Sequence, residues 1–238
     1  MTQTASRLPS VLLTKQAVLF DLFHTLTPLE SSWGDRRPMT HELLRVSKQA
    51  WHEQLLVHSR DRLAGEKTDA FAIIAGMARA IDPTIPDAVI RTATENRTAR
   101  FAAALANITP ETRHVIQTLR QCGLRIGLIS NADVMEVAGW AQCPIADLFD
   151  ATVFSCHVGW VKPEAEIYQL CLKQLNVSPA ASIFVGDGGS NELAGAKTLG
   201  LTTVMIAGII RELWPEKIAE RATHADFQIE HLPELLHQ

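Results

Sequence analysis

The fold of this chain is decided by residues 17–21, AVLFD, in which four apolar residues are followed by a carboxylate. A short apolar run of this kind is typical of a fully buried β-strand. Desolvating a carboxylate at the end of such a strand is costly, so Asp21 indicates a functional site more strongly than it indicates a turn cap. Thr25 follows four residues later.

Three further segments carry polar groups where a strand is expected to end. Ser130 and Asn131 follow GLI, Lys162 lies in GWVKPE, and Asp187 lies in IFVGDGGSNE. In a parallel sheet, ligands bind beyond the carboxyl ends of the strands, and all of these side chains would meet there. We therefore expect one site that includes Asp21.

The remaining pattern predicts an α/β fold with an inserted helical segment. From Thr109 onward, helical runs end at Gly123 and Gly200 and each is followed by a β-rich run, which predicts a Rossmann-like parallel sheet. Pro110 suits the first turn of a helix. From about Arg36 to Ala106, apolar residues recur at helical spacing. We expect an α/β core of residues 1–27 and 109–238, and a helical cap of residues 28–108.

Composition narrows the range of partners. The 238 residues are 47% hydrophobic, and the formal net charge is −4 without basic runs, which argues against nucleic acid or an anionic membrane as partner. We expect a small-molecule anionic substrate; oligomeric state is not indicated. No apolar run is long enough to span a membrane. The four cysteines lack CxxC or zinc spacing, so we expect reduced thiols in a cytoplasmic protein.

The four segments resemble, in order, the four motifs of the haloacid dehalogenase superfamily, which often carries a helical cap at the position of this insert. The resemblance implies that Asp21 is a nucleophile that forms a covalent aspartyl intermediate. It implies that Thr25 and Ser130 donate hydrogen bonds from their hydroxyls and that Lys162 supplies a fixed positive charge. Asn131, together with Phe23 and His24 from the first motif, is expected to contact the substrate.

The same resemblance implies a magnesium site. Two carboxylates facing a phosphate would repel it unless a hard cation with oxygen ligands offsets the charge. The implied ligands are Asp21, the backbone carbonyl of Phe23, and Asp187. Glu192 stands five residues after Asp187, where the family usually has Asp, and would act directly, through water, or by pairing with Lys162.

One position departs from the phosphatases of the superfamily. They carry a second Asp two residues after the nucleophile as general acid and base, and this chain has Phe23 there. An aromatic residue at that position, like Tyr168 six residues after Lys162, resembles the haloacid dehalogenases, whose halide leaving group needs no proton and which use no metal. His24 and His157 are alternative groups for proton transfer.

Three functions are therefore open from the sequence. The first is a magnesium-dependent phosphatase of a small phosphorylated metabolite, the second a metal-independent 2-haloacid dehalogenase, and the third a catalytically weak binding protein. A solvated helix face explains most of the insert's arginines better than a role in the site, but five of them are candidates for holding an anionic substrate: Arg36, Arg37, Arg91, Arg97 and Arg100.

Overall fold

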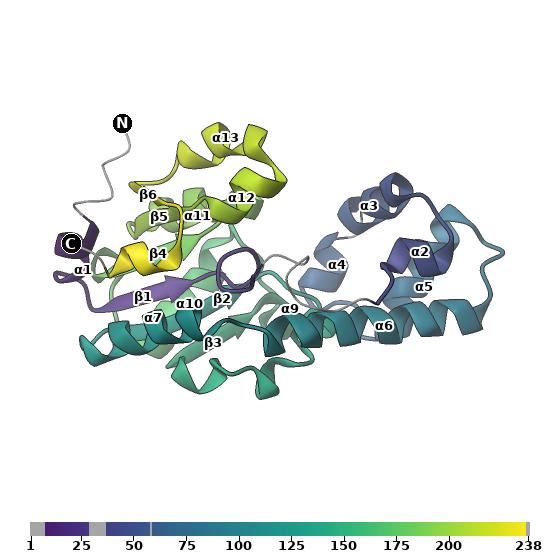
Figure 1. The fold of residues 1–238 in the computed structure, drawn as a ribbon, viewed down its shortest axis with the longest axis horizontal. Coiled ribbons are helices and arrows are strands. Elements are labelled where there is room, and N and C mark those ends of the chain that lie inside the picture. Colours follow the sequence, from purple (N-terminus) through teal and green to yellow (C-terminus); the bar gives the residue numbers. More distant parts are fainter. Residues whose placement is uncertain (1–7, 29–36, 58, 237–238) are drawn as a thin grey trace.

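The structure is a computed structural model that describes residues 8–28, 37–57 and 59–236. Its centre is a parallel sheet of six strands in the order β3-β2-β1-β4-β5-β6, which confirms the Rossmann-like α/β fold (Figure 1). The strands are β1 (Ala17–Phe20), β2 (Arg125–Ser130), β3 (Ala151–Phe154), β4 (Ser182–Gly186), β5 (Thr202–Ile206) and β6 (Phe227–Ile229).

Helices cover both faces of the sheet because alternate side chains of each strand point to opposite sides. Val18 and Phe20 pack in one apolar cluster with α1 (Leu8–Leu12) and α7 (Pro110–Gln121). Ala17 and Leu19 pack in a second cluster with α10 (Ala165–Leu175) and α11 (Glu192–Thr198). The β1 strand is therefore buried on both faces, as its uninterrupted apolar run predicts.

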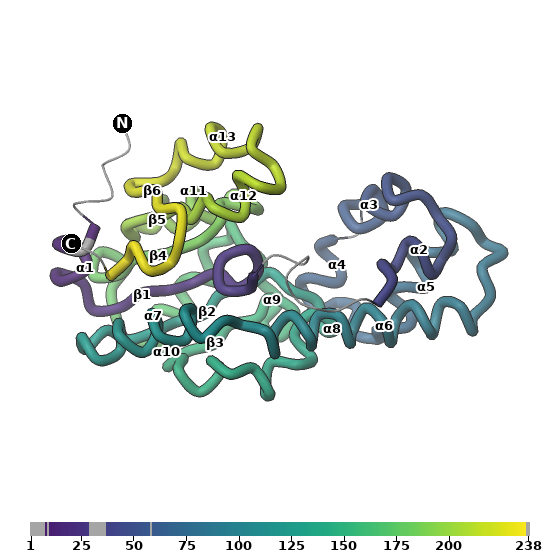
Figure 2. The backbone as a smooth tube through the Cα atoms, viewed as in Figure 1, coloured from purple at the N-terminus to yellow at the C-terminus, as the bar shows by residue number. Residues whose placement is uncertain are grey.

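Between β1 and α7, the residues that the structure describes form five helices, which we call the helical insert. They are α2 (Thr40–Leu44), α3 (Lys48–Val57), α4 (Ser59–Leu63), α5 (Ala70–Ile81) and α6 (Asp87–Ala106). The insert lies beyond the carboxyl end of β1, at the opposite end of the molecule from α1 (Figures 1 and 2). It has an apolar cluster of its own around Trp51 and Ile74, which one core residue, Met135, joins.

The insert and the core touch at close range. Gly65, which has φ +72°, lies directly against Cys156, so that a Cβ at Gly65 would stand 2.0 Å from the Cys156 carbonyl oxygen. Gly139 approaches Ala102 of α6 in the same way, with 2.8 Å between the Ala102 Cα and a Cβ built at Gly139. These backbone contacts hold the insert next to the sheet edge where the site is expected.

The local predictions are mostly confirmed. Helix α7 begins at Pro110, and Gly123 and Gly200 both have positive φ after their helices. The helix after Lys162, α10, begins at Ala165. The remaining helices are α8 (Val134–Val137), α9 (Ser155–Val158), α12 (Gly208–Leu213) and α13 (Ile218–Ala222), with 3-10 turns at Trp140–Gln142, Ala146–Leu148, Pro179–Ala181, Gly189–Asn191, Pro215–Lys217 and Leu232–Leu235.

Within the described ranges, no helix combines the length and the apolar character that crossing a bilayer requires. The cysteines are free, and three of them are buried, as expected for packed thiols.

Candidate active site

Asp21 lies directly after β1 in a tight loop. Its backbone N–H donates to the Val185 carbonyl at 2.9 Å, which continues the β1–β4 pairing by one residue. Its side chain is buried, and Oδ2 accepts a hydrogen bond from Thr25 Oγ1 at 3.1 Å. The turn itself needs a left-handed residue, His24, with φ +61°, whose N–H donates to Thr27 Oγ1 at 3.1 Å. The loop thus aims one carboxylate at the sheet edge.

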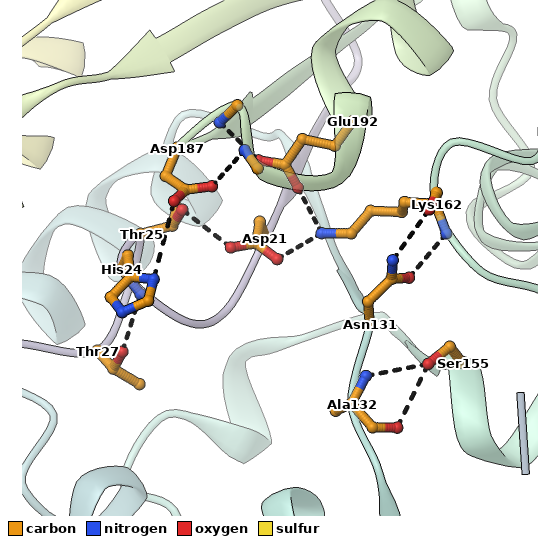
Figure 3. A network of polar contacts seen from close by, with 12 residues as sticks. Asp21, His24, Thr25, Thr27, Asn131, Ala132, Ser155, Lys162, Asp187 and Glu192 are labelled. Atoms are coloured by element: carbon orange, nitrogen blue, oxygen red, sulfur yellow. Dashed lines mark hydrogen bonds and ion pairs between the residues drawn. The ribbon is translucent and has the colours of Figure 1, made fainter. Parts of the chain in front are cut away.

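Lys162 lies between two carboxylates (Figure 3). Its Nζ, which is buried, donates to Asp21 Oδ1 and to Glu192 Oε2. Burial alone lowers the pKa of the Lys162 ammonium, but the two neighbouring carboxylates outweigh burial and raise that pKa above its ordinary value. The ammonium therefore stays charged, as the sequence-based prediction requires.

Asn131 positions Lys162. Its Oδ1 accepts from the Lys162 backbone N–H at 2.7 Å, and its Nδ2 donates to the Lys162 carbonyl at 3.0 Å. Both ends of the amide are thus engaged by one residue of a distant loop. The sequence analysis expected this amide to contact the substrate; in the structure both of its polar atoms bond to the backbone of Lys162.

Asp187 directly follows β4 and faces Asp21 (Figure 3). Its Oδ1 accepts from Gly189 N–H at 2.7 Å and its Oδ2 from Arg221 Nη1 at 2.8 Å, while His24 Nδ1 lies 3.8 Å from Oδ2. Glu192 closes the loop by accepting from Gly188 N–H at 2.9 Å. The backbone amides of Gly188 and Gly189 thus hold the carboxylates of Glu192 and Asp187.

Asp21, Asp187 and Glu192 form one buried group whose ligand atoms lie within 4.8 Å of one another. Burial raises the pKa of the Asp21 carboxyl, with Lys162 opposing and Asp187 adding to the rise. Burial also raises the pKa of Glu192 well above its ordinary value, against the opposing effect of Lys162. Three clustered oxygen donors with excess negative charge fit Mg²⁺ by donor chemistry. A role for the Phe23 carbonyl stays a prediction.

Ser130, at the end of β2, has a buried hydroxyl without a hydrogen-bond partner among the residues that the structure describes. Most buried hydroxyls in proteins form a hydrogen bond, so an unpaired buried hydroxyl needs an explanation, and a role in binding a ligand is one. Ser155 offers a contrast, because its Oγ accepts from Ala132 N–H at 3.0 Å and reaches the Ala132 carbonyl at 3.3 Å.

A cavity of about 360 Å³ opens between the insert and the core. The three residues predicted to contact substrate, Phe23, His24 and Asn131, all line it. The insert contributes Arg97 and Arg100, which are both buried and therefore not part of a solvated helix face. The Phe23 ring packs edge-on against Phe101 of the insert, with 5.4 Å between centroids.

The other candidates of the sequence analysis lie elsewhere. His157 is exposed on α9. Tyr168 is fully buried, and its hydroxyl donates to the Glu192 backbone carbonyl at 2.8 Å, so it supports the loop as part of the core. Arg91 lies over the Phe71 ring, and Arg36 falls outside the described residues.

Two residues near the site escaped the sequence analysis. Arg221 contacts Asp187, and Trp214 packs edge-on against His24 with 5.3 Å between ring centroids. Both come from the segment between β5 and β6, where no motif or spacing marks them. The only indication of Arg221 and Trp214 in the sequence was that a helical segment follows the fourth motif.

Comparison with known proteins agrees with this geometry. A family model described as haloacid dehalogenase-like hydrolase matches residues 15–200. The glyceraldehyde 3-phosphate phosphatase of Pyrococcus abyssi is 33% identical over 98 residues, which make up 40% of this chain and 40% of that protein. This chain spans less than half the length of the first curated relatives that it matches.

Two solved structures share the fold. The crystal structure of a dehalogenase is 21% identical with a TM-score of 0.66, and the alignment covers 93% of this chain and 96% of that one. A magnesium complex of a HAD family enzyme from Bacteroides thetaiotaomicron is 19% identical with a TM-score of 0.62, and the alignment covers 81% and 93%. At these identities the likeness concerns the fold alone.

Proposed function

Because this chain belongs to the haloacid dehalogenase-like hydrolases, we propose that it is a magnesium-dependent phosphatase of a small phosphorylated metabolite, acting through an aspartyl-phosphate at Asp21. The proposal includes Asp21, Thr25, Ser130 and Lys162 as the catalytic groups. It also includes a cytoplasmic location, with which the free cysteines agree.

The observation that carries the proposal is the buried group of three carboxylates, which Lys162 and Arg221 neutralise only in part. When all three acids are ionised, the group keeps a net negative charge that would repel a phosphate dianion in a site of low dielectric. Magnesium held by Asp21, Asp187 and Glu192 would offset this charge and polarise the phosphate. A metal-free dehalogenase has no need for the acid at Asp187.

Two comparisons support the same choice. The relative from Pyrococcus abyssi is named as a phosphatase, and the Bacteroides enzyme of the same fold was solved with magnesium. The cavity adds a third point, because its lining includes two arginines, Arg100 and Arg97, of which Arg97 also pairs with Glu136.

Each group then has a defined task. An Asp21 oxygen forms a bond to phosphorus while the bond from phosphorus to the ester oxygen breaks, which leaves an aspartyl-phosphate and an alkoxide. Lys162 neutralises charge beside Asp21, and the hydroxyls of Thr25 and Ser130 are placed to donate to Asp21 and to the phosphate. Water then attacks the phosphorus, which restores the carboxylate and releases inorganic phosphate and a proton.

Phe23 stands where the phosphatases have an acidic residue, and it has no proton to give, so the leaving group must take its proton from another source. A general acid typically contributes about 10² to 10⁴ in rate, so alkyl phosphates, whose alkoxide is a poor leaving group, should react slowly. Aryl phosphates need little protonation. We therefore expect faster turnover of an aryl phosphate than of an alkyl phosphate of similar size.

The test is a parallel assay of phosphate release from p-nitrophenyl phosphate and an alkyl phosphate, and of halide release from 2-chloropropionate, each with magnesium and with a chelator. We expect magnesium-dependent phosphate release that falls by more than about 10³-fold in Asp21→Asn and loses its magnesium response in Asp187→Asn. Asp147→Asn is the matched control, because the Asp147 side chain is 71% exposed. Phosphate release that survives chelation or the Asp21 change would contradict the proposal.

The second candidate function is the metal-independent dehalogenase, and Phe23 is the residue that favours it. Halide release unaffected by the chelator would establish it in the same assay. Saturable binding of a phosphate ester without turnover of either substrate set would instead indicate a binding protein.

A further inference from the structure

Arg221, from α13, reaches into the proposed metal site from a segment outside the four motifs. Its Nη1 donates to Asp187 Oδ2 at 2.8 Å and to the Asp187 backbone carbonyl at 3.1 Å. One guanidinium nitrogen therefore holds both the side chain and the backbone of the same acid. The Arg221 side chain is 18% exposed and that of Asp187 is 8% exposed, so solvent screens this pair only weakly.

The chain around Arg221 is shaped to hold it. Gly188 has φ +82°, and a Cβ there would stand 2.8 Å from the Arg221 Cβ, so only glycine leaves room for the arginine stem. The Arg221 guanidinium carbon lies 5.8 Å from the centroid of the ring of Trp214, the residue that directly follows α12. The contact between Arg221 and Asp187 thus depends on the loop that contains Gly188 and on the segment that contains Trp214 and Arg221.

The charge that Arg221 adds is the same kind of charge that a metal would supply. Asp21, Asp187 and Glu192 carry three negative charges when ionised, and Lys162 offsets one of them. Arg221 offsets a second, at the acid farthest from Lys162 in the network of contacts. A divalent cation bound at Asp187 would lie close to this guanidinium and would be repelled by it.

We infer that Arg221 is a positioning residue that fixes the Asp187 carboxylate and lowers the affinity of the site for a divalent cation. The inference rests on the proposed function, because it assumes that Asp187 is a metal ligand. Its consequence is that this site binds magnesium more weakly than a site with the same three carboxylates and no arginine.

The test is calorimetric titration of Mg²⁺ alone into the full chain and into Arg221→Gln, which keeps a hydrogen-bond donor and removes the charge. We expect the dissociation constant for Mg²⁺ to fall at least tenfold in Arg221→Gln and to stay near the wild-type value in Arg221→Lys. Arg211→Gln is the control, because Arg211 pairs with Glu230 on the surface. Circular dichroism without metal checks that each variant is folded.

Should Arg221→Gln not fold, Arg221→Met keeps the apolar stem against Gly188 and carries the same expectation. Unchanged or weaker Mg²⁺ binding in a folded variant that lacks the charge would overturn the inference. If the wild-type protein binds Mg²⁺ and needs it for phosphate release while Arg221→Gln binds no tighter, only this inference fails. If neither protein binds Mg²⁺, the metal requirement of the proposed function fails with it.

Discussion

At the scale of single residues, two buried serines at neighbouring strand ends have opposite surroundings. Ser130 presents a hydroxyl without a described partner, whereas Ser155 bonds to both polar groups of the Ala132 backbone. A polar group that stabilises the fold should be paired, and a polar group kept for a ligand need not be. Substitutions of the two serines should therefore have different effects, one mainly on activity and the other mainly on stability.

We predict that Ser130→Ala lowers kcat/KM for a phosphate ester by about 10- to 100-fold, which corresponds to a loss of about 1.4 to 2.7 kcal/mol of transition-state binding. The same change should alter the free energy of unfolding by less than about 0.5 kcal/mol. Ser155→Ala should do the reverse. It should cost about 1 to 2 kcal/mol of stability, because it leaves the Ala132 N–H unpaired, with activity per folded molecule nearly unchanged. Urea unfolding and steady-state kinetics on both variants check this, and a large stability loss in Ser130→Ala would contradict it.

At the scale of elements, the short helix α8 joins the core to the insert through buried charges. Its N-cap, Asp133, accepts from Arg62 Nη1 at 2.9 Å, and Glu136 accepts from Arg97 Nη2 at 2.6 Å. Asp133 and Glu136 also cap the helix reciprocally. Both arginines belong to the insert, so this cluster of two acids and two arginines fixes α4 and α6 against the core.

Glu136 makes the stability of this junction depend on pH. Burial, with a further contribution from Asp133, raises its pKa from 4.5 to about 6 against the opposing effect of Arg97 and Arg62. The folded state then binds more protons than the unfolded state between these values, so the free energy of unfolding falls as pH rises through this window. A shift of this size corresponds to about 2 kcal/mol.

We predict that the stability of wild-type protein relative to Glu136→Gln falls by about 2 kcal/mol between pH 4.5 and pH 7. Buried acids that do not contact Glu136, such as Asp21 and Glu192, contribute equally to both proteins and cancel in this difference. Urea unfolding at a series of pH values measures it, and Glu95→Gln on the exposed side of α6 serves as control. Parallel pH profiles of wild type and Glu136→Gln would show that Glu136 does not titrate in this window.

At the scale of the whole molecule, two bodies of different architecture enclose one site. The core supplies Asp21, Lys162 and Asp187 from segments that follow its strands. Side chains of α3 and α6 from the insert line the neighbouring cavity together with Phe23, His24 and Asn131 of the core. The cavity of about 360 Å³ is in the range of small-molecule pockets. The three acids of the site offer little surface to a large molecule, because Asp21, Asp187 and Glu192, taken as whole residues, are each 6% exposed or less.

We therefore predict selection by size. Phosphomonoesters of small metabolites should be hydrolysed with kcat/KM at least about 100-fold higher than a phosphorylated peptide, which cannot bring its phosphate past the insert without displacing it. A phosphate-release panel of increasing substrate size measures this, with Asp21→Asn to subtract background. Equal activity on the peptide would mean that the insert opens fully during turnover.

Much of this arrangement could be predicted from residue order. The strand at residues 17–20, the helix at Pro110 and the grouping of Asp21, Ser130, Lys162 and Asp187 follow from apolar periodicity, from helix caps and from the cost of burying charge. Each of these properties depends on residues that are close together in the sequence. The carboxyl ends of parallel strands meet at one edge of the sheet, so polar residues that follow different strands can be predicted to share one site. The residue boundaries of the core and the cap remain predictions.

Other features depend on how distant elements pack. The clamp of Asn131 on the Lys162 backbone, the contact of Arg221 with Asp187 and the burial of Arg97 against Glu136 join residues that are between 31 and 39 positions apart. No spacing along the chain specifies such pairs, because they depend on crossing angles and side-chain rotamers that emerge only when the helices dock on the sheet. The sequence therefore predicted the carboxylates of the site, but the tertiary structure decided which residues contact them. The physical reason is that the interaction energy of a charge depends on the distance to its neighbours and on its burial, and both are set only when the chain folds.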